Sequence, residues 1–272
     1  MPFKLYIDSR FRKNIDDLQS DSNFTVELPH PIKVKGKAFC DICVVANAFY
    51  TVRFNENDRI HIKEGGNFRI CQIAEGQYSI ETLKDAVLAA IDTDRPVGLG
   101  HYFVTSLQGK SKLQISNPDP NADLTIYSAA YLKRNQTVWG GTSISYTNLM
   151  SSDAVVGFAN TLNVLAFGTL NTIEFPNTVN VQPYNQLFLR SDLGLGYDAL
   201  GADGSGDIIR RIVCPVAQND LIIDNHSLPT DTVSIGNRQI QSLAFRLTDV
   251  YGNLVNTRGH AVSFSLIFIE DD

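Results

Sequence analysis

Cysteine is scarce in this chain, and long apolar runs are missing. Four cysteines among 272 residues are too few and too scattered to form a disulfide framework, which favours a reducing compartment. No apolar stretch approaches the roughly 20 residues that a membrane-spanning helix needs, so we expect no membrane span. The N-terminus shows no basic segment followed by an apolar core, and we therefore expect no signal peptide.

Positive charge is also in short supply. The chain has 23 Lys and Arg against 29 Asp and Glu, which gives a net charge of -6 and a pI near 5.3. Such a field repels phosphate backbones, so we expect no specific nucleic-acid binding. Two small basic groups stand out, one near the start with Arg10, Arg12 and Lys13, and one in a loop-like stretch with Lys33, Lys35 and Lys37. Mixed charge on short surface segments is common, so we expect ordinary solvated strand ends at both places.

The patterns of catalytic and metal sites are absent as well. Cys40 and Cys43 have the spacing of a zinc knuckle or a redox pair, but they lie in an expected strand. Strand side chains three residues apart point to opposite faces, and no second cysteine pair follows. The five histidines include no His-x-His or His-Glu-x-x-His pattern, and no Gly-x-Ser-x-Gly elbow is present. We therefore expect no catalytic residue, no cofactor and no metal, and we predict that the protein is not an enzyme.

A segment rich in glycine and aspartate, 192–207, is the remaining candidate for ligand binding. Its glycines, Gly194, Gly196 and Gly201, faintly resemble a dinucleotide-binding loop. The segment neither follows a parallel strand nor opens a helix, so it would not aim backbone amides at a phosphate. Its aspartates, Asp198, Asp203 and Asp207, are out of register with a calcium-binding loop. We expect a long, exposed, solvated loop.

Alternating apolar side chains are what the sequence does contain, and they are clearest at the C-terminal end. Leu243, Phe245 and Leu247 recur every second residue, and the same period continues from Val262 to Phe268. This period is typical of strands with one buried face. Turn-forming residues such as Asp249 and Gly252 separate the two runs. The spacing predicts two long strands joined by a turn as a hairpin that lies on other strands.

Further strands are expected along the whole chain. Asn23–Leu28 alternates until Pro29 and Pro31 end it, since proline cannot donate to a ladder. Ala38–Ala46 is apolar on both faces, as expected for a strand that is covered on both sides. Glycines at 65 and 66 predict a hairpin of Arg59–Lys63 with Phe68–Ile73. Other expected strands are Tyr102–Leu107, Lys112–Ser116, Asp123–Tyr127, Asn177–Val181, Leu187–Arg190, Ile208–Cys214 and Leu221–Asp224.

Two helices interrupt this series. Apolar residues recur at helical spacing from Ile80 to Ile91, and Ser79 is placed to cap the helix. A shorter helix is expected from Ser152 to a stop at Gly157. About a dozen short strands with two helices predict an all-β fold, a single jelly-roll sandwich with additional short strands and two short helices in the middle of the chain. We expect one domain over 1–272, with inserted loops or a small subdomain within about 77–207.

Several segments carry a resemblance when they are taken together and in order. They are Tyr6–Arg10, Ser22–Pro29, Val44–Tyr50, Glu75–Leu83, Val156–Phe158, Leu187–Asp192, Ile209–Pro215, Phe245–Asn253 and the terminal strand. Across nearly the whole chain they resemble the penton (minor capsid) proteins of virophages, Polinton-like viruses and related large DNA viruses. The resemblance implies a single jelly roll that stands upright in an icosahedral capsid, with five copies at each vertex and no catalytic residue.

The same resemblance implies partners and a location. The partners are the chain itself as a homopentamer, a major capsid protein of the double jelly-roll type, and internal minor capsid proteins. The location is the virion capsid, after synthesis and assembly in the host cell cytoplasm or a virus factory. Major capsid proteins of that type are typically much longer than 272 residues, which favours the vertex protein. From charge alone, we expect the basic start at Arg10, Arg12 and Lys13 to face inward.

Two alternatives stay open at this point. The first is a trimeric receptor-binding or carbohydrate-binding β-sandwich, such as a spike head or lectin-like module. An exposed loop aromatic such as Trp139 or Tyr197 would then stack on a sugar or receptor. The second is an enzyme on a jelly-roll scaffold, because a fold by itself does not determine chemistry.

Overall fold

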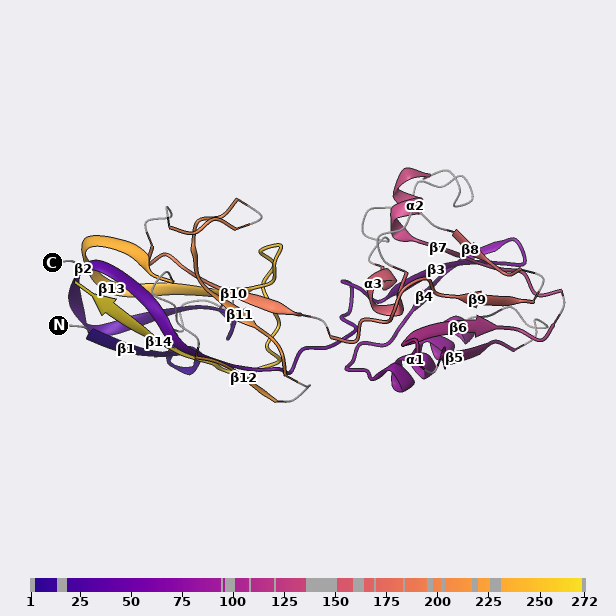
Figure 1. Cartoon of the computed structure of the whole chain (residues 1–272), viewed down its shortest axis with the longest axis horizontal. Coiled ribbons are helices and arrows are strands. Elements are labelled where there is room, and N and C mark those ends of the chain that lie inside the picture. Colours follow the sequence, from indigo (N-terminus) through magenta and orange to yellow (C-terminus); the bar gives the residue numbers. More distant parts are fainter. Residues whose placement is uncertain are drawn as a thin grey trace. The chain divides into compact units, whose positions relative to one another are not determined.

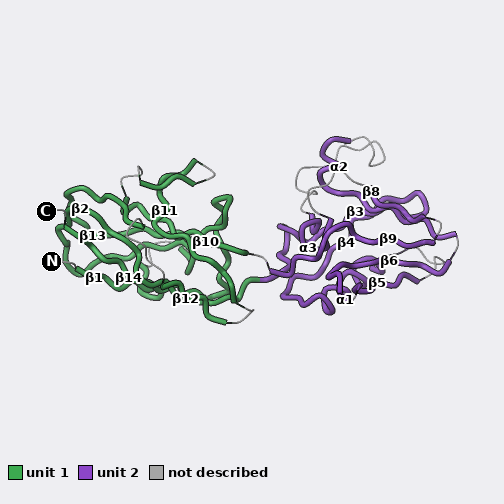
Figure 2. The backbone as a smooth tube through the Cα atoms, viewed as in Figure 1, with its two compact units in different colours: residues 1–49, 184–272 green, residues 50–183 purple. Residues whose placement is uncertain are grey.

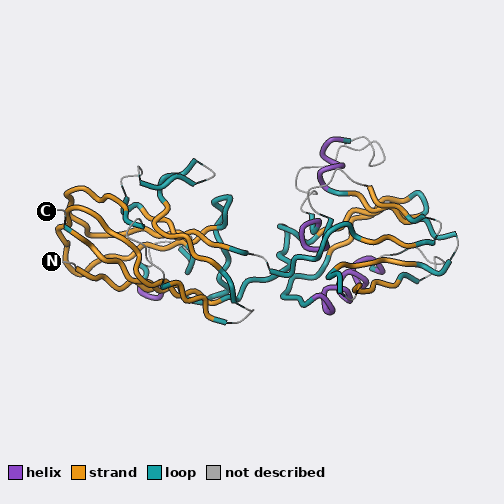
Figure 3. Tube along the Cα trace, viewed as in Figure 1, coloured by secondary structure: helices purple, strands orange, loops and turns teal. Residues whose placement is uncertain are grey.

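The computed structural model consists mainly of strands joined by turns and a few short helices (Figure 3). It describes residues 3–13, 19–93, 95, 101–107, 109–119, 121–135, 151–158, 164–168, 170–182, 184–194, 198–201, 204–216, 220–225 and 231–270. The antiparallel sheets are curled and the helices short, which confirms the prediction of an all-β, jelly-roll-like fold. The chain divides into two compact units, unit 1 with residues 1–49 and 184–272 and unit 2 with residues 50–183 (Figure 2).

Unit 1 contains one large antiparallel sheet that curls around an apolar core (Figure 1). Its strands are β1 (Phe3–Asp8), β2 (Asn23–Ala46), β10 (Gln186–Ser191), β11 (Ile208–Val213), β12 (Leu221–Asp224), β13 (Val233–Thr248) and β14 (Val262–Ile269), and a 3-10 turn, η1 (Ser9–Phe11), follows β1. The strand order is β1-β14-β2-β13-β10-β11, and β12 also pairs with β2. Inside the curl, the rings of Phe245 and Phe264 meet edge to face with centroids 4.8 Å apart. This contact ties β13 to β14 across the core.

Strand β2 belongs to both sides of the curl because it is 24 residues long. Its residues 37–45 pair with β14 and residues 43–46 with β12, whereas residues 23–38 pair with β13. Gly36 and Gly236 lie opposite each other in the β2–β13 pair with φ of 97° and 67°, a backbone region that favours glycine. Both strands can therefore bend at one point. We call β1, β14, residues 37–46 of β2 and β12 layer one of the sandwich.

The prolines do not end the first strand, so the expected break after Leu28 is wrong. Strand β2 continues through Pro29 and Pro31. Its ladder with β13 shifts register there, because Glu27 pairs with Ser242 and Ile32 pairs with Ile240. The residues between them oppose a single residue of β13, so the ladder needs no donor from either proline. For the same reason Lys33, Lys35 and Lys37 lie on a strand rather than in a loop.

The two C-terminal strands exist as expected, but they do not form a hairpin. Strand β13 pairs with β2 and β10, and β14 pairs with β1 and β2, so β2 lies between them. A bridge between Thr248 and Leu254 turns the chain back on itself directly after β13. The connection then continues to Val262, which is too long for a tight hairpin loop.

Unit 2 has a core of its own between two smaller sheets and a helix. Its strands are β3 (Arg59–Glu64), β4 (Asn67–Gln72), β5 (Phe103–Leu107), β6 (Lys112–Ser116), β7 (Leu124–Tyr127), β8 (Val164–Ala166) and β9 (Thr172–Glu174). The sheet orders are β4-β3-β7-β8 and β5-β6-β9. The helices are α1 (Ile80–Asp92), α2 (Ala129–Arg134) and α3 (Asp153–Val156). The range of about 77–207 expected for an insertion overlaps this unit over 77–183.

Local predictions hold well in unit 2, and non-local ones hold less well. The β3–β4 hairpin is present, and Ser79 and Thr82 form a reciprocal capping box at the start of α1. The expected strand Asn177–Val181 is wrong, because its backbone donates to two different segments, to Val155 and Gly157 at the end of α3 and to Ser111. The sequence did not predict α2, β8 or β9, which are only three to six residues long. Among the described residues, no helix is long and apolar enough to cross a membrane.

Candidate functional site

The ionisable side chains of the described ranges form no metal-binding cluster. No group of three or more His, Cys, Asp and Glu residues in this part of the chain is placed so that it could hold a metal ion. His61 is buried in β3, His30 and His260 are exposed on unit 1, and His101 is exposed on unit 2. His226 lies outside the described residues. The histidines that can be located therefore do not converge on one point.

The aspartates of the 192–207 segment are engaged in contacts within unit 1. Asp198 accepts hydrogen bonds from the main chain and hydroxyl of Ser234, at 2.6 and 3.2 Å. Asp207 pairs with the buried Arg190 at 2.9 Å and also with Arg246. Gly196 and Asp203 lie outside the described residues. These carboxylates therefore fasten the loop to β10 and β13 and are not directed toward a bound cation.

Cys40 and Cys43 share one face of β2, so the expectation that they point apart is wrong. Cys43 pairs with Phe264 and Cys40 pairs with Leu266, which leaves two residues of β2 opposite Ser265. This bulge resets the alternation and turns both thiols into the same core, where both are fully buried. The hydrogen bond with Cys40, together with burial, raises the pKa of the Cys43 thiol well above its ordinary value. Thiols of this kind are poor nucleophiles and poor metal ligands at neutral pH.

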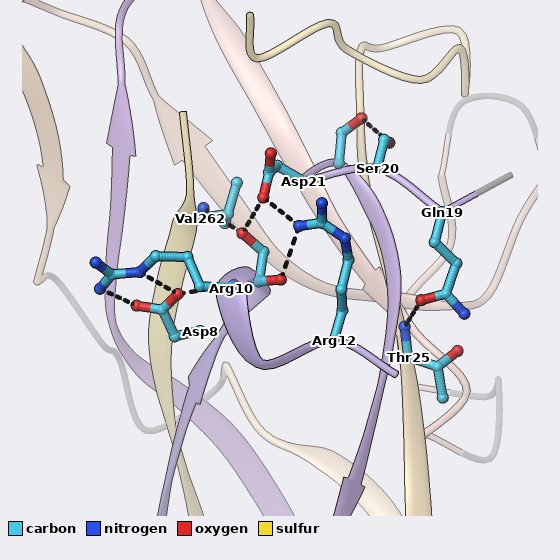
Figure 4. A network of polar contacts seen from close by, with 10 residues as sticks. Asp8, Arg10, Arg12, Gln19, Ser20, Asp21, Thr25 and Val262 are labelled. Atoms are coloured by element: carbon cyan, nitrogen blue, oxygen red, sulfur yellow. Dashed lines mark hydrogen bonds and ion pairs between the residues drawn. The ribbon is translucent and has the colours of Figure 1, made fainter. Parts of the chain in front are cut away.

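The basic start of the chain is neutralised by neighbouring carboxylates (Figure 4). Arg10 forms a two-pronged pair with Asp8 at 2.9 and 2.7 Å, and the hydrogen bond from Arg10 lowers the pKa of Asp8. Arg12 contacts Asp21 at 2.8 Å. Lys13 contacts Glu27 of β2 at 2.7 Å. The three cations therefore give no excess of positive charge, which removes the basis for an inward-facing basic start.

The same network fastens η1 to the sheet (Figure 4). The Ser9 hydroxyl donates to Asp21 at 2.8 Å and accepts from the main chain of Val262, the first residue of β14, at 3.0 Å. Arg12 also donates to the carbonyl of Ser9 at 3.1 Å. Ser9 is buried, so its bond with Val262 is shielded from water, and its bonds with Asp21 and Arg12 are partly buried. We assign the network a structural role.

The outward side of layer one is apolar over several strands. Strand register places Tyr6 of β1 opposite Ser265, and it places Val44 of β2 between Ser263 and Ile223. The exposed fractions are 76% for Tyr6, 39% for Ile42, 57% for Leu221 and 59% for Ile223, and Val44 is half-buried. We call these five side chains, Tyr6, Ile42, Val44, Leu221 and Ile223, the outer face. Contiguous exposed apolar patches on a folded protein are typical of interaction surfaces.

A hollow of about 720 Å³ borders this surface. It is lined by Tyr6, Ile42 and Val44 of the outer face, by Phe11 of η1, and by residues 26–29 of β2. The sequence indicated part of this surface, because Ala38–Ala46 is apolar on both faces. It could not indicate that Tyr6 and Ile223 join the same surface, since strand order alone brings them there. Trp139 and Tyr197, the aromatics proposed for ligand stacking, lie outside the described residues.

No protein-family model matches the sequence, and no curated protein matches it either. Among solved structures, the crystal structure of the mavirus penton protein is similar, with a TM-score of 0.51 and 8% sequence identity. The match covers 100% of this chain and 100% of that chain. The chain has a penton-like fold. At 8% identity the likeness concerns the course of the backbone and not the residues of a site.

Proposed function

We propose that the protein is a structural component of a virus capsid and forms the pentameric vertex of an icosahedral shell. The observation that carries the proposal is the likeness to a viral penton protein over the full length of both chains. The sequence segments from Tyr6–Arg10 to Phe245–Asn253 support it independently, because they resemble the penton family in order. The proposed role requires no catalysis.

The proposed role implies how the protein assembles and what each of its two units does. Five copies close into a ring through a heterologous interface, in which two different patches of each copy meet. We assign the capsid jelly roll to unit 1 and treat unit 2 as a domain inserted between β2 and β10. The partners of the ring are a major capsid protein of the double jelly-roll type and internal minor capsid proteins. The protein then resides in the virion capsid, after synthesis in the host cytoplasm or a virus factory.

The mass of the purified protein in solution tests the proposal. We expect light scattering over a range of concentrations to give about 150 kDa, five times the chain mass of 30.1 kDa. Electron microscopy of the same sample should show five-fold rings. A stable trimer would contradict the vertex role and favour a spike head. If the protein stays monomeric, addition of the major capsid protein should produce shells with this chain at their vertices, and its absence from such shells would contradict the proposal.

A further inference from the structure

The outer face is unusual for the outward side of a sandwich layer. Strands of an antiparallel sandwich normally alternate between an apolar core side and a polar solvent side. Apart from Asp41, residues 38–46 of β2 are instead apolar on both sides, which is typical of a strand covered twice. Unit 1 covers the inner side with its core, yet within the described residues Ile42 stays 39% exposed and Ile223 stays 59% exposed. No described residue of unit 1 supplies this second cover, which leaves a surface outside unit 1 as its source.

The charges around the hollow limit which kind of surface can cover it. On the outward side of layer one, Lys4 is paired with Asp41 at 2.7 Å. Asp8, which lines the hollow, is paired with Arg10 at 2.7 Å. Burying the hollow leaves neither of these two pairs without its counter-ion, and Lys4, the one cation among the described residues that line the hollow, offers no surplus charge to a phosphate. The matching surface is therefore another neutral, largely apolar protein surface.

Unit 1 carries a suitable projecting side chain on the loop after β13. Tyr251 is 79% exposed. The Asp249 side chain accepts hydrogen bonds from the main chain of Tyr251 at 2.8 Å and of Asn253 at 2.9 Å, and from the Asn253 amide at 3.1 Å. The turn that presents the ring is thus held by three bonds. Tyrosines presented in this way are the anchors that protein interfaces favour, because little side-chain entropy is lost on binding.

These observations fit an assembly in which copies of the chain form a closed ring. We propose that the outer face of one copy is covered by a second copy of this chain, whose Tyr251 enters the hollow beside Tyr6 and Ile42. The inference rests on the proposed vertex function, since a closed ring needs two unlike, complementary patches on each copy. The hollow beside layer one and the rigidly held Tyr251 on the loop after β13 supply such a pair of patches. An exposed apolar surface also needs a partner that is present as soon as the protein is made. A second copy of the chain meets this requirement.

Charge insertion on each side tests the inference in the full-length protein. Ile223→Asp and Tyr6→Asp each place a carboxylate on the outer face, and Tyr251→Asp removes the anchor. All three positions are more than half exposed, so we expect unchanged thermal unfolding. We expect each variant to lose the oligomer and to scatter as a monomer at concentrations where the unchanged protein is a ring. Leu170→Asp is the matched control, because Leu170 is 86% exposed on unit 2, and this variant should keep the ring.

Mixing the variants tests the pairing itself. Ile223→Asp protein keeps Tyr251, and Tyr251→Asp protein keeps the outer face, so one intact junction can form between them. We expect an equimolar mixture to give a 1:1 heterodimer and nothing larger. A mixture that stays monomeric would overturn the assignment of Tyr251 as the counterpart. Dimers of the Tyr251→Asp protein alone would overturn it as well, because the outer face would then pair with itself.

The outcomes separate this inference from the vertex function. A pentamer that survives Ile223→Asp and Tyr6→Asp would keep the vertex function and overturn the outer face as its interface. A trimer that dissociates in these variants would overturn the vertex function and keep the outer face as the contact between copies. A protein that stays monomeric at every concentration would overturn the inference that a second copy covers this face. Loss of the ring in Leu170→Asp would also count against it, because the effect would not be specific to layer one.

Discussion

Asp153 begins helix α3 with its carboxyl group turned toward the protein. Its Oδ2 atom accepts a hydrogen bond from the main chain of Ala129 at 2.8 Å. Burial nevertheless raises the pKa of Asp153 to about 6, and the hydrogen bonds from Ser151 and Ala129 only partly oppose this shift. The ordinary value is 3.8, so the folded protein holds this proton more tightly than the unfolded chain does. The charged carboxylate therefore lowers the stability of unit 2 above pH 6, and this cost vanishes below about pH 4.

Asp153→Asn should remove that cost, because an amide resembles the protonated acid and can still accept from Ala129. At pH 8 we expect the free energy of unfolding to rise by about 2 kcal/mol, somewhat less than the full pKa shift implies, since Asp153 is only half-buried. At pH 4.5 the gain should be much smaller. Urea unfolding at the two pH values measures the difference. Asp85→Asn, at an exposed position of α1, is the control and should change the free energy of unfolding by less than about 0.5 kcal/mol. Equal gains from Asp153→Asn at the two pH values would contradict the argument.

Glu64 shows why single residues can mislead when only the sequence is considered. Its place beside Gly65 and Gly66 suggests an exposed turn residue, but its side chain is buried. It accepts from Arg69 at 2.8 Å, from Arg95 at 2.9 Å and from the Tyr102 hydroxyl at 2.7 Å. Burial opposes ionisation, but these three hydrogen bonds outweigh it and lower the pKa of Glu64. The partners lie up to 38 residues away, so no local pattern reveals them.

At the scale of elements, Gly157 ends helix α3 where another segment passes very close. Its φ is 87°, and a Cβ atom at this position would lie 2.3 Å from the carbonyl oxygen of Asn177. The Asn177 main chain cannot retreat freely, because it donates a hydrogen bond to Gly157 itself. We expect Gly157→Ala to destabilise unit 2 by about 3 kcal/mol, through both the clash and the left-handed backbone.

Thermal or urea unfolding of the variant measures this cost. Gly168→Ala is the matched control, since nothing lies within 4 Å of the added methyl group and the backbone there is not left-handed. The control should change stability by less than about 0.5 kcal/mol. If the two alanine variants unfolded alike, the close approach of 177 to α3 would be refuted.

Elements that depend on local pattern were predicted, and those that depend on distant chain were not. Alternation gave the strands of unit 1, and the capping residue and helical spacing gave α1, because both signals lie within a few residues. Alternation tells which side of a strand is buried but not which strand lies beside it. For this reason the sequence did not predict that β2 lies between β13 and β14. Bulges reset the alternation without a sequence signal, which explains the error on Cys40 and Cys43.

The outer face also combines features that a local sequence pattern predicts with features that depend on distant parts of the chain. The apolar residues of 38–46 indicated a strand that needs cover on both sides, and this part was visible in the sequence. The contribution of β1 and β12 was not, because these strands lie at opposite ends of the chain and meet only through the sheet order. The rigid turn under Tyr251 was visible only as a cluster of turn-forming residues.

At the scale of the whole molecule, the sequence of unit 2 interrupts the sequence of unit 1. The chain leaves unit 1 after Phe49 and re-enters it at Tyr184, and the rings of these two residues meet edge to face with centroids 5.1 Å apart. A Gly/Ser linker of about four residues can therefore join 49 to 184 without moving either end. Each unit also has a separate apolar core, so neither core is lost when the other unit is removed.

We expect the protein with 50–183 replaced by such a linker to fold and to form the same ring, because the outer face and Tyr251 all belong to unit 1. Residues 50–183 expressed alone should fold as a monomer. Circular dichroism measures folding, and light scattering measures the oligomer against the full-length protein. A shortened protein that folds but stays monomeric would place the contacts between copies on unit 2. A ring that forms and then dissociates on Tyr251→Asp would instead locate assembly in the jelly roll, and unit 2 would be free to vary without affecting the vertex.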